Sequence, residues 1–86
     1  MDSYAVVFAR SARKELESLP DRFIERIMPR IENLADSPRP VGCRKLSGGQ
    51  NLWRLRIGDY RVIYSVDDHQ RIIDVVAVRH RKDAYR

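Results

Sequence analysis

The 86-residue sequence has little of what several protein classes require. It contains one cysteine, Cys43, so no disulfide can form within the chain, and this favours a reducing compartment such as the cytoplasm. No apolar run approaches the roughly 18 residues of a membrane span, and the first residues lack a basic and apolar leader. We therefore expect a chain that is neither exported nor embedded in a membrane.

Residues that would hold a metal or a cofactor are also scarce. The two histidines, His69 and His80, lie eleven residues apart and match no metal-ligand spacing together with Cys43. Residues 46–51 contain two glycines but lack the Gly-Lys-Ser/Thr ending of a phosphate loop. No serine stands in the nucleophile elbow of a hydrolase triad. The sequence predicts no metal, no cofactor and no serine hydrolase.

What is present describes a small folded protein with an uneven charge. Four glycines, four prolines, 43% hydrophobic and 34% charged residues are typical of one compact domain, here residues 1–86. Residues 1–40 hold seven Lys/Arg and seven Asp/Glu, whereas residues 41–86 hold ten and five. The whole net charge of +5 therefore lies in the second half, which favours a polyanionic partner. The alternative is that many small proteins are basic without binding one.

Hydrophobic periodicity divides the chain at Pro40. Residues 4–8 read as a strand, and a helix with Ser11 as its N-cap follows and ends at Pro20. Apolar residues at spacings of three and four predict a second helix from Asp21 to about Ser37. After Pro40 the period is two, which predicts strands over 52–57, 60–66 and 71–79 with turns at 58–59 and 67–70.

These elements predict an α+β fold. The N-terminal strand and the helical hairpin would pack on one face of a mainly antiparallel sheet of four to five strands. The other face would be open and would carry arginines. Arg54 and Arg56 share a face by the period of two, Arg61 lies beside them across the turn, and Arg81 shares the parity of Arg79, Ala77 and Val75.

Such an arginine set has two interpretations. Exposed sheets need charge for solubility and to protect their edges. The acids of this half lie mostly in turns, however, so we favour a site for a phosphodiester, whose oxygens a guanidinium fork can hold. Tyr85 would stack on a base or share a proton with a 2′-hydroxyl, which only RNA has. By parity His80 falls on the helix side with Val76 and Val78, as a structural residue or a substrate contact.

Three strings of residues resemble the RelE branch of the RelE/ParE toxin superfamily, and the likeness extends over essentially the whole chain. They are Leu46-Ser47-Gly48, the run 52–64 that ends in Gly58-Asp59-Tyr60-Arg61-Val62-Ile63-Tyr64, and the run 78–86 that ends in His80-Arg81-Lys82-Asp83-Ala84-Tyr85-Arg86. The resemblance implies the toxin of a type II toxin-antitoxin pair. It also implies a ribosome-dependent endoribonuclease that cleaves mRNA in the A site by metal-independent attack of a 2′-hydroxyl.

The resemblance also assigns roles to positions. Arg54 and Arg56 match paired basic strand residues, Arg61 and Arg81 match arginines that brace the phosphate or the leaving group, and Tyr85 matches a stacking or nucleophile-orienting tyrosine. This catalytic set is supported by an expected RNA-binding set: Lys45, Arg79, His80, Lys82 and Arg86. The family prototype has lysines where this chain has Arg54 and Arg56, and arginine is a poorer general base. No glutamate follows Glu32, so charge stabilisation must carry the rate.

Two other functions fit the same sequence. One is a ParE-like inhibitor of DNA gyrase without nuclease activity. The other is a degenerate, non-catalytic module whose basic face only binds nucleic acid. Either toxin function implies a cognate antitoxin, an acidic segment that folds on the basic face or displaces residues 82–86. The nuclease function adds mRNA and the ribosome as partners.

Overall fold

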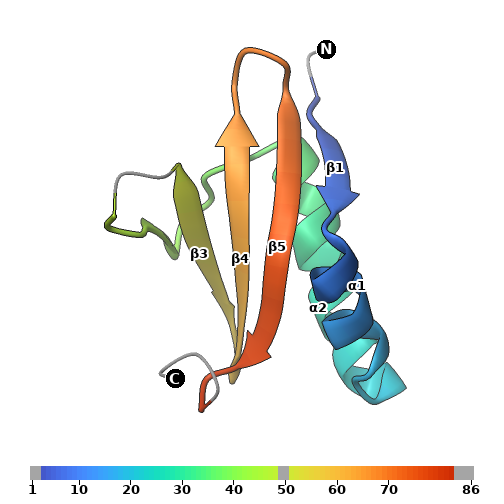
Figure 1. Cartoon of the computed structure of the whole chain (residues 1–86). Coiled ribbons are helices and arrows are strands. Elements are labelled where there is room, and N and C mark those ends of the chain that lie inside the picture. Colours follow the sequence, from blue (N-terminus) through green and yellow to red (C-terminus); the bar gives the residue numbers. More distant parts are fainter. Residues whose placement is uncertain (1–2, 49–50, 83–86) are drawn as a thin grey trace.

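The computed structural model describes residues 3–48 and 51–82 and contains two helices and a five-stranded sheet (Figure 1). None of the helices in these residues is long and apolar enough to cross a membrane. The elements in chain order are β1 (Ala5–Phe8), α1 (Arg10–Glu17), α2 (Asp21–Glu32), a short 3₁₀ turn (Asn33–Ala35), β2 (Cys43–Lys45), β3 (Leu52–Ile57), β4 (Tyr60–Asp67) and β5 (Ile72–His80).

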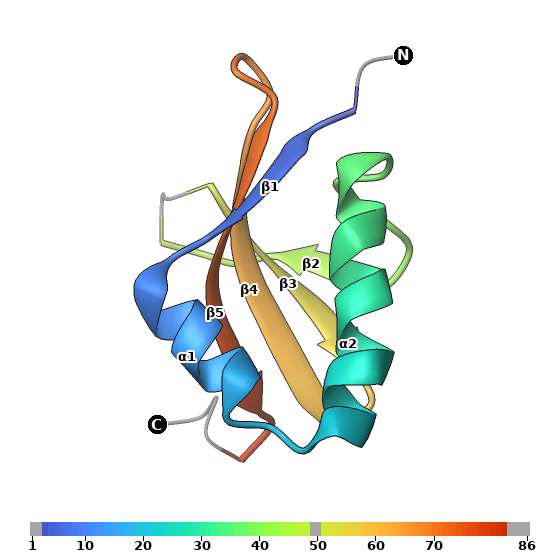
Figure 2. The same cartoon turned by 90° about the vertical axis from the view of Figure 1, so that its right-hand side faces the viewer.

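The strands are arranged in the order β1-β5-β4-β3-β2. Three pairings are antiparallel, and β1 pairs in parallel with β5, so the sheet is mixed. Both helices lie on the same side of the sheet (Figure 2). The predicted α+β fold is confirmed. The sequence did not reveal β2, a strand of only three residues.

The helix boundaries differ from the prediction in two respects. The helical segment from Asp21 to about Ser37 is an α-helix only to Glu32 and then a 3₁₀ turn to Ala35, and the predicted cap of the first helix was wrong. The residue that precedes α1 is Ala9, in extended conformation, so Ser11 is in the first turn and is not the N-cap. One reason is that Ala9 still belongs to the path of β1, where its N–H donates to the Val75 carbonyl at 2.8 Å. Pro20 precedes α2, where its fixed φ and missing N–H cost little.

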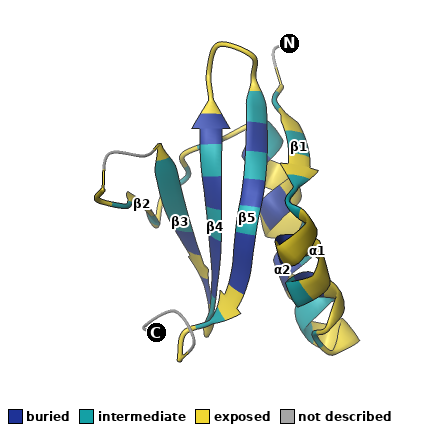
Figure 3. Cartoon of the chain, in the orientation of Figure 1, coloured by how far each residue is buried: buried dark blue, intermediate teal, exposed yellow. Residues whose placement is uncertain are grey.

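The core lies between the two helices and the central strands. The most deeply buried side chains come from α1, α2, the 3₁₀ turn and β3 to β5, and Figure 3 shows that the buried residues concentrate on β4 and β5. Tyr64 is fully buried, and its hydroxyl donates to the Pro38 carbonyl at 2.7 Å. Burial raises the pKa of this hydroxyl far above its usual value. The hydrogen bond from Tyr64 to Pro38 thus anchors the segment between α2 and β2 to the core.

One irregularity changes the face of several residues. The register between β4 and β5 shifts between Ile63 and Tyr64, so Tyr64 lies opposite Val75 and Val76 has no direct partner. Val75 is completely buried in the core together with Val78. The prediction that Val75 shares a face with Arg79 was therefore wrong, because simple alternation does not hold across a bulge.

Candidate nucleic-acid interface

The side of the sheet away from the helices carries a row of arginines. Arg56 of β3 lies opposite Arg61 of β4, and Arg61 lies opposite Arg79 of β5. On the other side of β3, Arg54 lies opposite Arg44 of β2. We call these five arginines the basic face. The sequence predicted four of them, but it missed Arg44 because the short strand β2 was not recognised.

The basic face contains three directly opposed pairs of like charge. Such pairs destabilise a sheet, because the two side chains lie about 5 Å apart. A surface that needed charge only for solubility could use opposed lysine and glutamate pairs, which would avoid this repulsion. This chain instead retains the repulsion at Arg44–Arg54, Arg56–Arg61 and Arg61–Arg79. The pairing is therefore not what a surface charged only for solubility would require.

The row converges on the turn between β3 and β4. The Arg56 Nε donates to the Gly58 carbonyl at 3.4 Å. Beyond β5, the Arg81 N–H donates to the Asp59 carbonyl at 2.7 Å, and the Arg81 Nε lies 3.7 Å from Asp59 Oδ1. Gly58 has a φ of 58°, in the left-handed region that favours glycine, so this tight turn suits the residue. The predicted Gly58-Asp59 turn is confirmed.

Arg61 is the most enclosed member of this group. Its side chain is 6% exposed, and its Nη1 donates to the Arg81 carbonyl at 3.3 Å. The side chains of Arg79 and Arg81, by contrast, are 46% and 53% exposed. Because burial already holds the Arg61 guanidinium in place, it would have little side-chain entropy left to lose if an anion bound. We call Arg56, Arg61, Arg79 and Arg81 the arginine cluster.

Glu15 of α1 completes the arrangement at β5. Its Oε1 accepts the Val78 N–H at 3.0 Å, and its Oε2 accepts from the Arg79 Nε at 3.2 Å. The contact is possible because β1 pairs with β5 only as far as Val75, and α1 then lies beside the remaining edge. No signal in the sequence marks Glu15 as a partner of β5.

The other predicted site residues are distributed around this cluster. Lys45 lies opposite Trp53 and therefore on the helix side of the sheet, not on the basic face. His80 lies opposite Tyr60, and its ring contacts the Tyr60 ring edge-on, which confirms the predicted helix side. The exposed Lys82 donates its N–H to His80 Nδ1 at 3.3 Å. Tyr85 and Arg86 lie outside the described residues.

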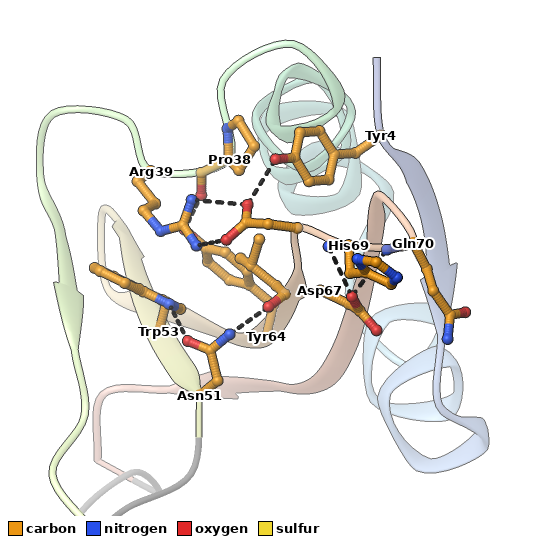
Figure 4. Close-up of polar contacts among 11 residues, drawn as sticks. Tyr4, Pro38, Arg39, Asn51, Trp53, Tyr64, Asp67, His69 and Gln70 are labelled. Atoms are coloured by element: carbon orange, nitrogen blue, oxygen red, sulfur yellow. Dashed lines mark hydrogen bonds and ion pairs between the residues drawn. The ribbon is translucent and has the colours of Figure 1, made fainter. Parts of the chain in front are cut away.

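An arginine at the opposite end of the sheet has a different environment (Figure 4). Arg39 donates to both carboxylate oxygens of Asp68, at 3.2 and 2.7 Å, and its guanidinium lies 5.1 Å from the centroid of the Trp53 ring. The Tyr4 hydroxyl also donates to Asp68, at 2.6 Å. The Trp53 Nε1 donates to Asn51, whose amide donates to the Val66 carbonyl. We call Tyr4, Arg39, Asn51, Trp53 and Asp68 the Arg39 network.

The Arg39 network shifts the acidity of its members. The hydrogen bonds from Arg39 and then from Tyr4 lower the pKa of Asp68. The hydrogen bond to Asp68 raises the pKa of the Tyr4 hydroxyl, and the same carboxylate raises the pKa of Arg39. These contacts join the residue before β1, the connection after α2 and the turn after β4. Arg39 therefore links separate segments of the chain, whereas the arginine cluster brings several cations together on one surface.

The molecule is a small mixed sheet with two helices on one face and a row of arginines on the other. Comparison with known proteins identifies the family to which this arrangement belongs. The family model for the ParE toxin of type II toxin-antitoxin systems matches residues 6–85. Toxin RelG of Mycobacterium tuberculosis is 33% identical over 87 residues, with 96% of this chain and 97% of that protein covered. The chain therefore belongs to the RelE/ParE superfamily of type II toxin-antitoxin toxins.

Two further relatives extend this result. The mRNA interferase toxin RelE of Escherichia coli K12 is 29% identical, with 96% of this chain and 90% of that protein covered. The archaeal RelE–RelB complex of Pyrococcus horikoshii contains a chain that is 34% identical and superimposes with a TM-score of 0.82, covering 92% of this chain and 96% of that one. The fold and the family predicted from the sequence are both confirmed.

Proposed function

We propose that this toxin is an endoribonuclease that cleaves mRNA in the A site of the ribosome. The observation that carries the proposal is the arginine cluster, in which Arg56 and Arg81 contact the β3–β4 turn while Arg61, bound to the Arg81 carbonyl, lies opposite both Arg56 and Arg79. A phosphodiester supplies the opposing charge. The relative in Escherichia coli is named an mRNA interferase, which supports the same class of substrate.

The reaction we propose is an internal transesterification. The 2′-hydroxyl oxygen attacks the adjacent phosphorus, the new O2′–P bond forms as the P–O5′ bond breaks, and the products carry a 2′,3′-cyclic phosphate and a 5′-hydroxyl. One proton leaves the 2′-hydroxyl and one reaches the departing O5′. The phosphorane in between carries an extra negative charge, and preorganised donors aimed at that charge provide the largest share of such catalysis.

Each arginine has a distinct place in this scheme. Arg61 is held by burial and by its bond to the Arg81 carbonyl, so we assign it to the non-bridging phosphate oxygens. The exposed Arg81, held over the turn by Asp59, would face the leaving-group side. Arg54 and Arg56 would hold phosphate along β3. Arginine is a weak general base, so charge stabilisation and the ribosome's positioning of the substrate would supply most of the rate.

We further propose that an antitoxin covers this surface. The relative from Pyrococcus horikoshii is solved in complex with RelB, which supports a partner of the same kind here. An acidic segment that folds on contact would neutralise the like-charged pairs of the basic face and relieve their repulsion. Binding of such a segment and binding of RNA would then exclude each other.

The test is primer extension on a defined mRNA in a purified translation system. Wild type is compared with Arg81→Ala and Tyr85→Phe, and naked mRNA serves as the control. We expect cuts within codons that require ribosomes and fade in both variants. An intact message with wild type would overturn the proposal.

A second function stays open because the matching family model is that of ParE toxins. A ParE-like protein would inhibit DNA gyrase without cutting RNA. The same purified protein in a gyrase supercoiling assay separates the two, since a nuclease leaves supercoiling unchanged. A protein that does neither but binds RNA with a strong salt dependence would be the non-catalytic module.

A further inference from the structure

A cavity of about 550 Å³ lies between the C-terminal half of α1 and the end of β5. It opens where β1 no longer covers β5, beyond Val75, so that α1 and the strand edge form its walls. Its size is within the range of about 300–1,000 Å³ that is typical of small-molecule sites. The residues that line it are Glu15, Ser18, Leu19, Tyr60, Val78, Arg79 and His80.

Part of the lining suits a flat heterocycle. The rings of Tyr60 and His80 lie 5.3 Å apart, centroid to centroid, at an interplanar angle of 88°, so they form a corner with two aromatic surfaces. Leu19 and Val78 add apolar surface to the same cavity. Unpaired RNA bases stack on aromatic side chains of this kind and use their edges for hydrogen bonds.

The polar part of the lining includes the Glu15 carboxylate beside Arg79 and His80. Its two oxygens are fixed by the Val78 N–H and the Arg79 Nε, yet the side chain remains 31% exposed. A carboxylate offers about four acceptor positions, so two bonds leave capacity for a ligand that donates. The free acceptor positions of a carboxylate suit a donor and disfavour a phosphate or an acidic side chain, which would present further acceptors to it. The occupant should therefore be uncharged, planar and a hydrogen-bond donor.

We propose that this cavity binds a nucleobase of the RNA substrate, and that Glu15 selects guanine. Guanine alone among the four RNA bases presents two adjacent donors, N1–H and N2–H, on its Watson–Crick edge. Adenine and cytosine each present an amino group beside an acceptor, and uracil presents one donor between two acceptors. When one of these three bases faces the fixed carboxylate, its acceptor atom finds no donor. An unpaired acceptor in a partly buried site lowers the affinity for that base.

Arg79 connects this cavity to the proposed cleavage site. It belongs to the basic face through its pairing with Arg61, and it also lines the cavity and contacts Glu15. A phosphate held by Arg79 would therefore place a neighbouring base at the edge of β5. The inference rests on the proposed nuclease function and adds a base-selecting residue, Glu15, to it.

The experiment is a titration of ¹⁵N-labelled protein with nucleosides, which carry no phosphate and cannot be cleaved. Guanosine, inosine, adenosine and uridine are the probes, and the amide of Val78 is the reporter because it donates to Glu15. We expect guanosine to bind about tenfold or more tightly than adenosine or uridine. Inosine, which lacks the 2-amino group, should bind with intermediate affinity.

Glu15→Gln is the informative variant, since the glutamine retains an acceptor for the Val78 N–H but replaces one carboxylate oxygen with a donor. It should lose the preference for guanosine. The matched control is Glu17→Gln, the same change on the same helix at a residue outside the cavity lining, and it should keep the preference. Thermal unfolding of both variants checks that they fold.

The outcomes separate this inference from the proposed function. Equal binding of all four nucleosides, or shifts away from Val78, Arg79 and His80, would overturn the inference even if the protein cleaves mRNA. A guanosine preference that survives Glu15→Gln would also overturn it. Guanosine binding that depends on Glu15, in a protein that leaves mRNA intact, would support the cavity while the nuclease proposal fails.

Discussion

The two ends of the sheet use arginine in opposite ways. At one end Arg39 is matched by a carboxylate, donates two hydrogen bonds to Asp68 and lies over the Trp53 ring. At the other end Arg56, Arg61 and Arg79 lie opposite one another across three strands. The Arg39 network joins separate segments of the chain, whereas the arginine cluster places like charges opposite one another, although Arg79 and Arg81 each also contact a carboxylate.

The difference gives a physical criterion for a functional charge. A charge that stabilises the fold is found with its counter-charge, and its hydrogen bonds lie within the protein. A charge kept for a ligand is found among like charges, and a carboxylate that it contacts engages only part of its guanidinium, as at Arg79 and Arg81, which contact Glu15 and Asp59 through Nε. By this criterion Arg39 is structural, because both of its terminal nitrogens donate to the Asp68 carboxylate and its guanidinium lies over the Trp53 ring.

The largest effect should come from the centre of the cluster. Arg61→Gln should lower single-turnover cleavage of ribosome-bound mRNA by about 100- to 1,000-fold, the range measured for removal of one preorganised donor. Because Arg61 is only 6% exposed, its replacement also changes buried contacts, so Tm is measured beside the rate to separate a loss of catalysis from a loss of stability.

Arg44→Gln is the matched control for this prediction. Arg44 lies on the same basic face but pairs with Arg54, away from the β3–β4 turn. Its loss should reduce cleavage by less than about tenfold, as expected for one exposed phosphate contact. Equal losses in both variants would mean that total charge matters and the arrangement at the turn does not.

A smaller effect, on stability alone, should follow from Tyr64→Phe at the structural end. The change removes the hydrogen bond to the Pro38 carbonyl from a fully buried side chain, at a cost of about 1 kcal/mol. For a domain of this size that corresponds to a fall in Tm of about 4–8 °C. Calorimetry measures the shift, and cleavage activity at 25 °C should be unchanged. An unchanged Tm would show that the hydroxyl contributes nothing to the connection after α2.

The smallest effect concerns pH. The pKa of Asp68 is lowered in the folded state by Arg39 and Tyr4, so the ionised carboxylate favours folding. Its contribution is present above the usual aspartate value near 4 and is lost as pH falls through the lower folded-state value. The difference in Tm between wild type and Asp68→Asn should therefore be largest near neutrality and should disappear in acid. A constant difference from pH 2.5 to 7 would contradict the assigned role.

Much of the fold could be predicted because periodicity reports burial. The change from a spacing of three and four to a spacing of two at Pro40 separated the helices from the sheet, and Gly58 marked the turn that aligns Arg56 with Arg61. The register beyond Ile63 could not be predicted, because a bulge leaves no sure mark in the sequence. Val75 was therefore assigned to the wrong face.

The candidate site was predictable only where it follows from strand alternation. Arg56, Arg61 and Arg79 were found in this way. Glu15 and Arg44 were not, since their positions depend on contacts between distant segments: α1 against the uncovered edge of β5, and the three-residue strand β2 against β3. Arg39 was visible in the sequence as one more cation, and only its contacts identify it as structural.

The most direct test of this account compares Arg81→Gln with Arg39→Gln, measuring the single-turnover rate on ribosome-bound mRNA and the Tm for each. Arg81→Gln should lower the rate by about 100-fold or more. It should change the Tm little, because the pair that Arg81 forms with Asp59 is exposed. Arg39→Gln should lower the Tm by several degrees and leave the rate within about threefold of wild type. A rate that falls with Arg39→Gln and survives Arg81→Gln would contradict the division between the two ends of the sheet.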